Sequence, residues 1–199
     1  MGVFVIRPTD KGGHLHSPSQ RLLELCKPLH PIVFNDLFCL SDSGVHTISV
    51  GAAGPADLDL HLEAVQLLPR AGELLPPILE RLQTARRERL GDAWLATAFQ
   101  GLPDWSHTPG QINLPVLLWL YELLEAWDLE SFARARYGLL GNGSHWFPGE
   151  NADQLDHAVS EQELQAVLGE SPWAAQVPEL LRQLRQRVGG QQTKRLAVP

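Results

Sequence analysis

The sequence contains few cysteines, no long apolar run and no excess of positive charge. Two cysteines in 199 residues, Cys26 and Cys39, are too few for a disulfide framework in a chain of this size. The densest apolar segment, residues 114–124, is interrupted by Pro115 and Glu122 and is shorter than the roughly 18 residues of a membrane span. These shortages argue against a disulfide-stapled scaffold and predict no membrane partner.

The net charge and the N-terminal residues indicate which binding partners and which cellular compartment to expect. The formal net charge of −7 argues against non-specific binding to nucleic acid. Residues 2–7 read GVFVIR, without the basic region and cleavage site of a secretory signal. Both cysteines fall in apolar stretches, and buried free thiols fit a reducing compartment. We expect a cytoplasmic protein with no nucleic-acid partner.

Strands and helices alternate in the first part of the chain. Residues 2–6 are a short apolar run typical of a strand buried on both faces, and residues 46–50 form a second strand. Residues 32–40, between them, have apolar side chains at helical spacing. This order predicts two adjacent parallel strands joined by a right-handed crossover.

Two further helices are expected beside these strands. Residues 17–20 read SPSQ, a capping box with proline at the first helical position, and start a helix that runs through Cys26. A helix also follows Gly54 and Pro55. Its inner stripe is predicted to consist of four apolar residues, Leu58, Leu62, Val65 and Leu68.

Two strands alone do not make a stable sheet. We therefore expect that strands are missing on the N-terminal side or that a partner supplies them. Without them at least one strand edge is open and the apolar side chains of Val3, Val5, Ile48 and Val50 lose part of their cover, which favours self-association through the strand edges.

The remainder of the chain carries helix signals only. A long helix is expected over residues 73–99, a helix capped by Asn113 follows, and another spans residues 129–140. Residues 160–163 read SEQE, a capping box, and residues 171–172 open a last helix. The inner stripe of that last helix is Val177, Leu180, Leu181, Leu184 and Val188.

The tryptophans of this part have two interpretations. They pack a small helical core, where each buries a large area, or they form a stacking surface for a partner. The core interpretation is favoured for the four concerned, Trp105, Trp119, Trp127 and Trp146.

Four segments together resemble the C-terminal part of the aldo/keto reductases. RPTDKGG at residues 7–13 and VGAAGPADLDLHL at residues 50–62 are similar to the ends of the last two barrel strands. TPGQIN at residues 108–113 and RYGLLGNGSHWFPG at residues 136–149 are similar to the helical extension of a bacterial branch of the family. The resemblance implies an α/β fold, with the last two strands of a (β/α)8 TIM barrel in residues 1–72, an all-α domain in residues 73–188 and a flexible tail in residues 189–199.

The same resemblance implies an NAD(P)H-dependent oxidoreductase that acts on small carbonyl compounds. A glycine-rich turn from strand to helix directs backbone N–H groups at one point, which suits a phosphate. An alternative is a turn that only starts a helix. The residues implied to bind the cofactor, NADPH, are Pro8, Thr9, Lys11, Gly12, Gly51, Ala52, Ala53, Asp57 and His61.

The catalytic tyrosine, lysine, aspartate and histidine of the family belong to its N-terminal half. The two tyrosines here, Tyr121 and Tyr137, match no part of that motif. We therefore assign no catalytic residue and expect that the chain alone is inactive. The alternative function is that of a truncated, non-catalytic relative that acts as a binding or assembly module.

No metal site is expected. His14 and His16 lack a third ligand at a matching spacing and are interpreted as exposed loop histidines. Many relatives in the family bind an iron–sulfur cluster through a run of four cysteines that ends in Cys-Pro, but residues 108–109 are Thr-Pro here, and no cysteine follows Cys39.

We predict that the purified protein is colourless and free of iron, because thiolates are the usual cluster ligands and the helical part has none. Metal analysis and the visible absorption spectrum after anaerobic purification measure this directly. Stoichiometric iron together with acid-labile sulfide would contradict it.

Overall fold

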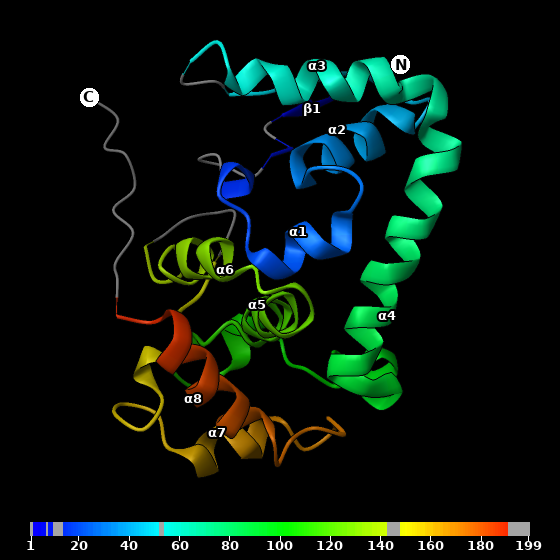
Figure 1. Cartoon of the computed structure of the whole chain (residues 1–199). Coiled ribbons are helices and arrows are strands. Elements are labelled where there is room, and N and C mark those ends of the chain that lie inside the picture. Colours follow the sequence, from blue (N-terminus) through cyan, green and yellow to red (C-terminus); the bar gives the residue numbers. More distant parts are fainter. Residues whose placement is uncertain (1, 7, 10–13, 52–53, 143–147, 191–199) are drawn as a thin grey trace, which may run out of the picture. The chain divides into compact units, whose positions relative to one another are not determined.

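The computed structural model describes residues 2–6, 8–9, 14–51, 54–142 and 148–190 (Figure 1). The chain divides into two compact units, Met1–Ala85 and Arg86–Pro199. This division falls inside one long helix, α4 (Ala71–Thr97), rather than at the expected residue 72. In the described part, no helix is both long and apolar enough to cross a membrane.

The first unit contains a parallel pair of strands, β1 (Val3–Ile6) and β2 (Val45–Ser49). Val3 pairs with Val45, and an irregularity then shifts the register so that Phe4 pairs with Thr47. The prediction of two adjacent parallel strands is confirmed. The chain between the strands forms a short 3-10 turn (His14–His16) and the helices α1 (Gln20–Cys26) and α2 (Pro31–Ser41).

The predicted fold class, a fragment of a TIM barrel, is wrong. Helices dominate the described residues, and the only sheet there is the two-stranded one. The strands are also not buried on both faces, because Phe4 and Ile6 are 70% and 74% exposed. A short apolar run fits a buried barrel strand or the open edge of a small sheet equally well, since periodicity alone does not distinguish them.

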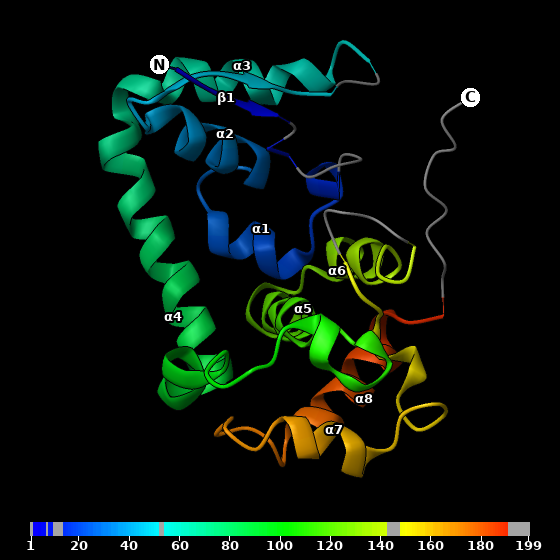
Figure 2. The same cartoon turned by 180° about the vertical axis from the view of Figure 1, so that it is seen from behind.

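Helix α2 forms the centre of the first unit. Ile32, Val33 and Leu37 on this helix are completely buried. Both views show α2 between α1 and α3 (Asp57–Leu67) (Figures 1 and 2). The core of this unit is therefore a stack of helices with the two strands beside it, and it depends on the contacts that α2 makes with its neighbours.

The predicted inner stripe of α3 is also wrong. Leu62 and Val65 are more than half exposed, and Leu58 and Leu68 are exposed as well. The opposite face is buried instead, with Ala64 completely covered and His61 almost so. Because α3 carries apolar residues on both faces, the spacing in the sequence does not decide which face turns inward.

Helix α4 contains a break that its continuous pattern does not reveal. Gly91 has φ 78° and ψ 156°, a backbone conformation that interrupts the helix and that glycine adopts without strain. Before the break, within the first unit, the guanidinium of Arg81 donates to the carbonyl of Leu25 at 3.0 Å and also to that of Lys27. These bonds satisfy carbonyl groups at the end of α1.

The second unit is helical, as expected. The Asn113 side chain accepts from the Val116 N–H and begins α5, and the Ser160–Glu163 capping box begins α7. Asp128, in the left-handed region with φ 56°, ends α5. The helices of this unit after α4 are α5 (Leu114–Trp127), α6 (Glu130–Tyr137), α7 (Glu161–Val167) and α8 (Val177–Val188).

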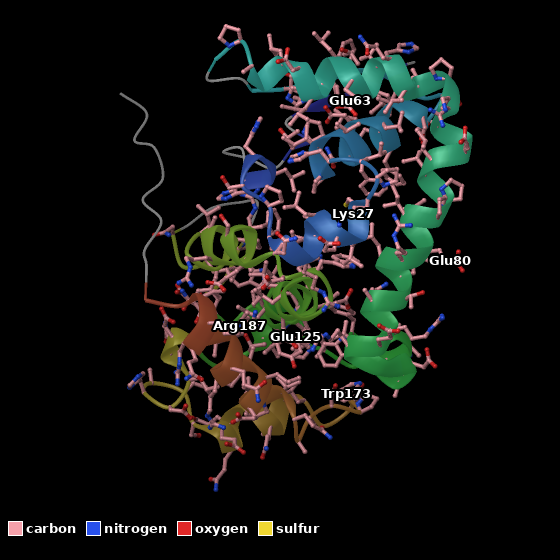
Figure 3. All side chains as sticks on the ribbon, in the orientation of Figure 1. Lys27, Glu63, Glu80, Glu125, Trp173 and Arg187 are labelled. Carbon is pink, nitrogen blue, oxygen red and sulfur yellow. The ribbon has the colours of Figure 1, made fainter. Side chains whose placement is uncertain are left out.

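Helix α8 has the predicted stripe but a later start, at Val177 rather than at residue 171. Four residues of the stripe are fully buried and Leu180 partly so. On its polar side, Arg182 holds the pKa of Asp156 down at about 2 through paired hydrogen bonds. Arg187 reaches Glu125 on α5 at 2.6 Å, and both side chains are labelled in Figure 3.

The tryptophans mainly pack against the core of the second unit. Trp119 and Trp127 are partly buried against it, as expected, and Trp105 is half-buried. Trp94, which the sequence interpretation missed, is 3% exposed and contacts Trp173 edge to face. The predicted Trp146 lies outside the described residues.

We predict that Leu184→Ala lowers the free energy of unfolding of the second unit by about 2–5 kcal/mol, because a fully buried leucine leaves a cavity. Gln186→Ala on the exposed side of the same helix is the control and should change it by less than about 0.5 kcal/mol. Denaturant unfolding followed by tryptophan fluorescence measures both. Equal effects would show that this stripe is not part of the core.

Candidate functional site

The two loops predicted to bind a cofactor follow the carboxyl ends of the two parallel strands. Parallel strands end at the same edge of a sheet, so both loops begin there. Of the nine predicted residues, the structure describes Pro8, Thr9, Gly51 and His61 completely. The other predicted positions, Lys11, Gly12, Ala52, Ala53 and the side chain of Asp57, lie outside the described residues.

The centre of the site is a buried pair formed by His61 and Asp36. The Asp36 carboxylate on α2 is completely buried, and its Oδ2 accepts a hydrogen bond from Nδ1 of His61 on α3. Asn35 lies beside it, with its amide nitrogen 3.3 Å from the other carboxylate oxygen. The pair thus joins two helices and fixes the orientation of the imidazole ring.

The other ring nitrogen of His61, Nε2, is buried and has no hydrogen-bond partner among the residues that the structure describes. A buried polar atom without a partner costs about 1–3 kcal/mol. Since Nδ1 carries the hydrogen shared with Asp36, Nε2 has a lone pair in the neutral ring and an N–H in the imidazolium. It can therefore accept a proton or donate to an anion.

The loop after β1 lies against this pair. The ring of His16 is edge-on to that of His61, with centroids 6.2 Å apart. The turn that holds His16 is linked to Thr9, because the Leu15 N–H donates to the Thr9 carbonyl at 3.4 Å. Thr9 itself is buried. The structure thus links Thr9, through the turn that holds His16, to the surroundings of His61, whereas Gly51 is exposed.

Histidines gather at this edge of the unit. His14 and His16 are half-buried, so their interpretation as exposed loop residues is wrong. His30 caps α2, with its Nδ1 accepting from the Ile32 N–H at 3.2 Å. In the part of the chain that the structure describes, no three histidine, cysteine or acidic side chains are arranged to hold a metal ion.

The two thiols are unsuited to nucleophilic chemistry. Burial raises the pKa of Cys26 to about 11. Burial, with a smaller contribution from the Asp36 charge, also raises the pKa of Cys39. Both side chains are therefore predominantly protonated thiols near neutral pH, and the thiolate is the reactive form.

An open depression of about 490 Å³ lies elsewhere in the first unit. None of the predicted site residues lines it, and it holds no titratable group. We therefore place the candidate site at the buried pair. The residues that line the depression are Leu40, Ser41, Leu68, Ala71, Gly72, Leu75 and Pro76.

Sequence reasoning missed Asp36. The signal that identifies it is its position, because residues 32, 33, 36 and 37 share one helical face and the other three are apolar. A carboxylate on an inner face needs a buried partner. The sequence does not show which residue is that partner.

No protein-family model, curated protein or solved structure matches the chain. The aldo/keto reductase resemblance therefore stays a prediction, and the function has to be inferred from the site itself.

We predict that the first unit loses stability as the pH falls below about 6.5. Burial, followed by the charge of His16, lowers the pKa of His30 from its usual 6.5, although Glu63 opposes this. The unfolded chain then binds more protons than the folded one, so acid favours unfolding. His30→Asn, which preserves a helix cap, should flatten this part of the pH profile. Histidine NMR titration showing a His30 pKa at or above 6.5 would contradict the prediction.

Proposed function

We propose that the first unit binds a phosphate-bearing ligand, NADPH in the first place, beside His61. In this proposal the chain serves an NAD(P)H-dependent oxidoreductase activity in the cytoplasm, as the resemblance to the aldo/keto reductases implies. The observation that supports it is the buried His61, which is held by Asp36, lies next to His16 and has no partner for its Nε2 in the described part of the chain.

The geometry of the pair favours this choice of ligand. The completely buried Asp36 carboxylate accepts from Nδ1 of His61, so Nε2 is the ring nitrogen that remains for a ligand. Phosphate oxygens are strong hydrogen-bond acceptors and, when protonated, donors. A phosphate can therefore pair with the polar atom of the pair that has no hydrogen-bond partner among the described residues.

Reduction of a carbonyl group also needs a proton donor beside the hydride, and the family that the chain resembles uses a tyrosine for it. Both tyrosines belong to the second unit. Tyr137 there is buried and donates to Asp153 at 2.7 Å, and burial raises its pKa strongly. We propose that the groups that act on a carbonyl substrate come from another segment or chain.

Titration with NADPH, NADH and inorganic phosphate tests the proposal. NADPH should bind the wild-type chain without turnover of a generic aldehyde. His61→Gln should weaken binding about tenfold or more, since a hydrogen bond to a charged group is worth about 1.5–3 kcal/mol. His157→Gln, on an exposed histidine of the second unit, is the control.

Three results would overturn this function. One is that NADPH and phosphate do not bind to the wild-type chain. Another is that NADPH binds equally well to the His61→Gln variant. The third is aldehyde reduction that is lost on changing a residue of this chain, because it would place the missing catalytic group here.

A second candidate is a binding or assembly module. The observation that favours it is the exposed apolar side chains of the first unit, on β1 and on one face of α3. A surface of this kind is typical of a protein that buries it against a partner.

A further inference from the structure

The outer face of α3 has the pattern of a helix that packs against something. Leu58, Leu62 and Val65 lie at i, i+4 and i+7 and form one stripe, which we call the outer stripe. They are 43%, 57% and 55% exposed. The inner face of the same helix, with His61 and Ala64, is already buried in the first unit. The outer stripe therefore stays about half exposed in the part of the unit that the structure describes.

Single exposed leucines are ordinary, but an aligned stripe is different. Each of these side chains forgoes part of the stabilisation that burial would give by remaining partly in water. The inner face of α3 needs only Ala64, His61 and partly buried leucines to pack. The outer stripe is thus not required by the core of the unit, and an interaction surface explains its spacing.

The charges beside the outer stripe indicate the chemistry of the partner. Asp59 is exposed on one flank of the stripe, and Glu63 lies one turn further along the same flank. Helix α3 carries no lysine or arginine between Asp57 and Leu67. The surface is therefore apolar in the middle and acidic on its exposed flank.

A second copy of the chain is a poor match for this surface. When two copies of a helix pack antiparallel about a two-fold axis, each flank of one helix lies against the same flank of the other helix. Asp59 and Glu63 would then meet Asp59 and Glu63 of the other copy, and like charges repel. A different protein whose surface carries lysine or arginine beside apolar side chains would complement the acidic flank.

We propose that the outer stripe of α3 docks another protein, one that presents an amphipathic helix with apolar residues flanked by Lys or Arg. This inference rests on the second candidate function, the assembly module, and is independent of ligand binding at His61. The apolar side chains supply most of the affinity, and the acidic flank selects the partner and makes binding sensitive to salt.

Two synthetic helical peptides with the same leucine stripe, one with lysine flanks and one with glutamate flanks, serve as probes for the full chain. Fluorescence anisotropy should show that the lysine-flanked peptide binds more tightly, by about fivefold, and that salt reduces the difference. Asp59→Lys should remove this preference. Glu80→Lys makes the same change of sign at an exposed site on α4 and should leave it intact; Glu63 and Glu80 are labelled in Figure 3.

Leu62→Gln tests the stripe itself and should weaken both peptides about tenfold, with unchanged NADPH binding as the sign of a folded unit. If NADPH does not bind even to the wild-type chain, the circular dichroism and unfolding curve of Leu62→Gln supply that control. Loss of the proposed ligand site and loss of this docking surface are therefore distinguishable.

Equal affinity for the two peptides, or no binding of either, would overturn the proposal. So would a dimer in sedimentation equilibrium that Leu62→Gln abolishes, because the occupant would then be a second copy. Leu184→Ala destabilises the second unit. If this change raised the affinity for the peptides, the second unit would itself be the occupant of the outer stripe, and the proposal of another protein would be overturned.

Discussion

The contact between Asp36 and His61 is the constraint on which the first unit depends. It places a completely buried carboxylate at the centre of the unit and commits α3 to one orientation on α2. Breaking a buried pair by removing one partner typically costs about 3–5 kcal/mol, because the remaining charge stays buried without compensation. Once His61 points inward, Ala64 follows it one turn later, and the leucines of the opposite face point to solvent.

That orientation connects the two functional surfaces of the unit. The inner face of α3 holds the imidazole whose Nε2 lacks a partner among the described residues, and the outer face holds the apolar stripe with its acidic flank. Neither surface is what the most stable packing would give. A unit built only for stability would bury the leucines of the outer stripe and would not bury the carboxylate of Asp36. Such departures from the best packing are where function is expected.

The second unit follows the opposite logic. Helix α8 buries one apolar face, whereas α5 is buried on nearly all sides, and both pack in a common core. The polar groups near this core are largely paired. Glu122, for example, accepts from the Trp94 indole at 3.3 Å and lies 2.6 Å from Nε of Arg86, in a close ion pair that is not aligned as a hydrogen bond. Among the described residues, each unit has one buried side-chain nitrogen without a hydrogen-bond partner, Nε2 of His61 in the first and Nε of Arg86 in the second, but Arg86 faces a carboxylate.

Local features of the chain were determined by the sequence alone. The caps at Asn113 and Ser160, the stripe of α8 and the parallel pairing of the two strands all follow from interactions within a few residues or from the order of the elements. Tertiary structure decided the rest. Only the folded unit shows that the strands form a two-stranded sheet and not part of a barrel, that Asp36 meets His61 across 25 positions of the sequence, and that α3 turns its leucines outward. The physical reason is that burial and charge pairing depend on which surfaces meet, and a helix with two apolar faces is compatible with either choice until a buried carboxylate selects one.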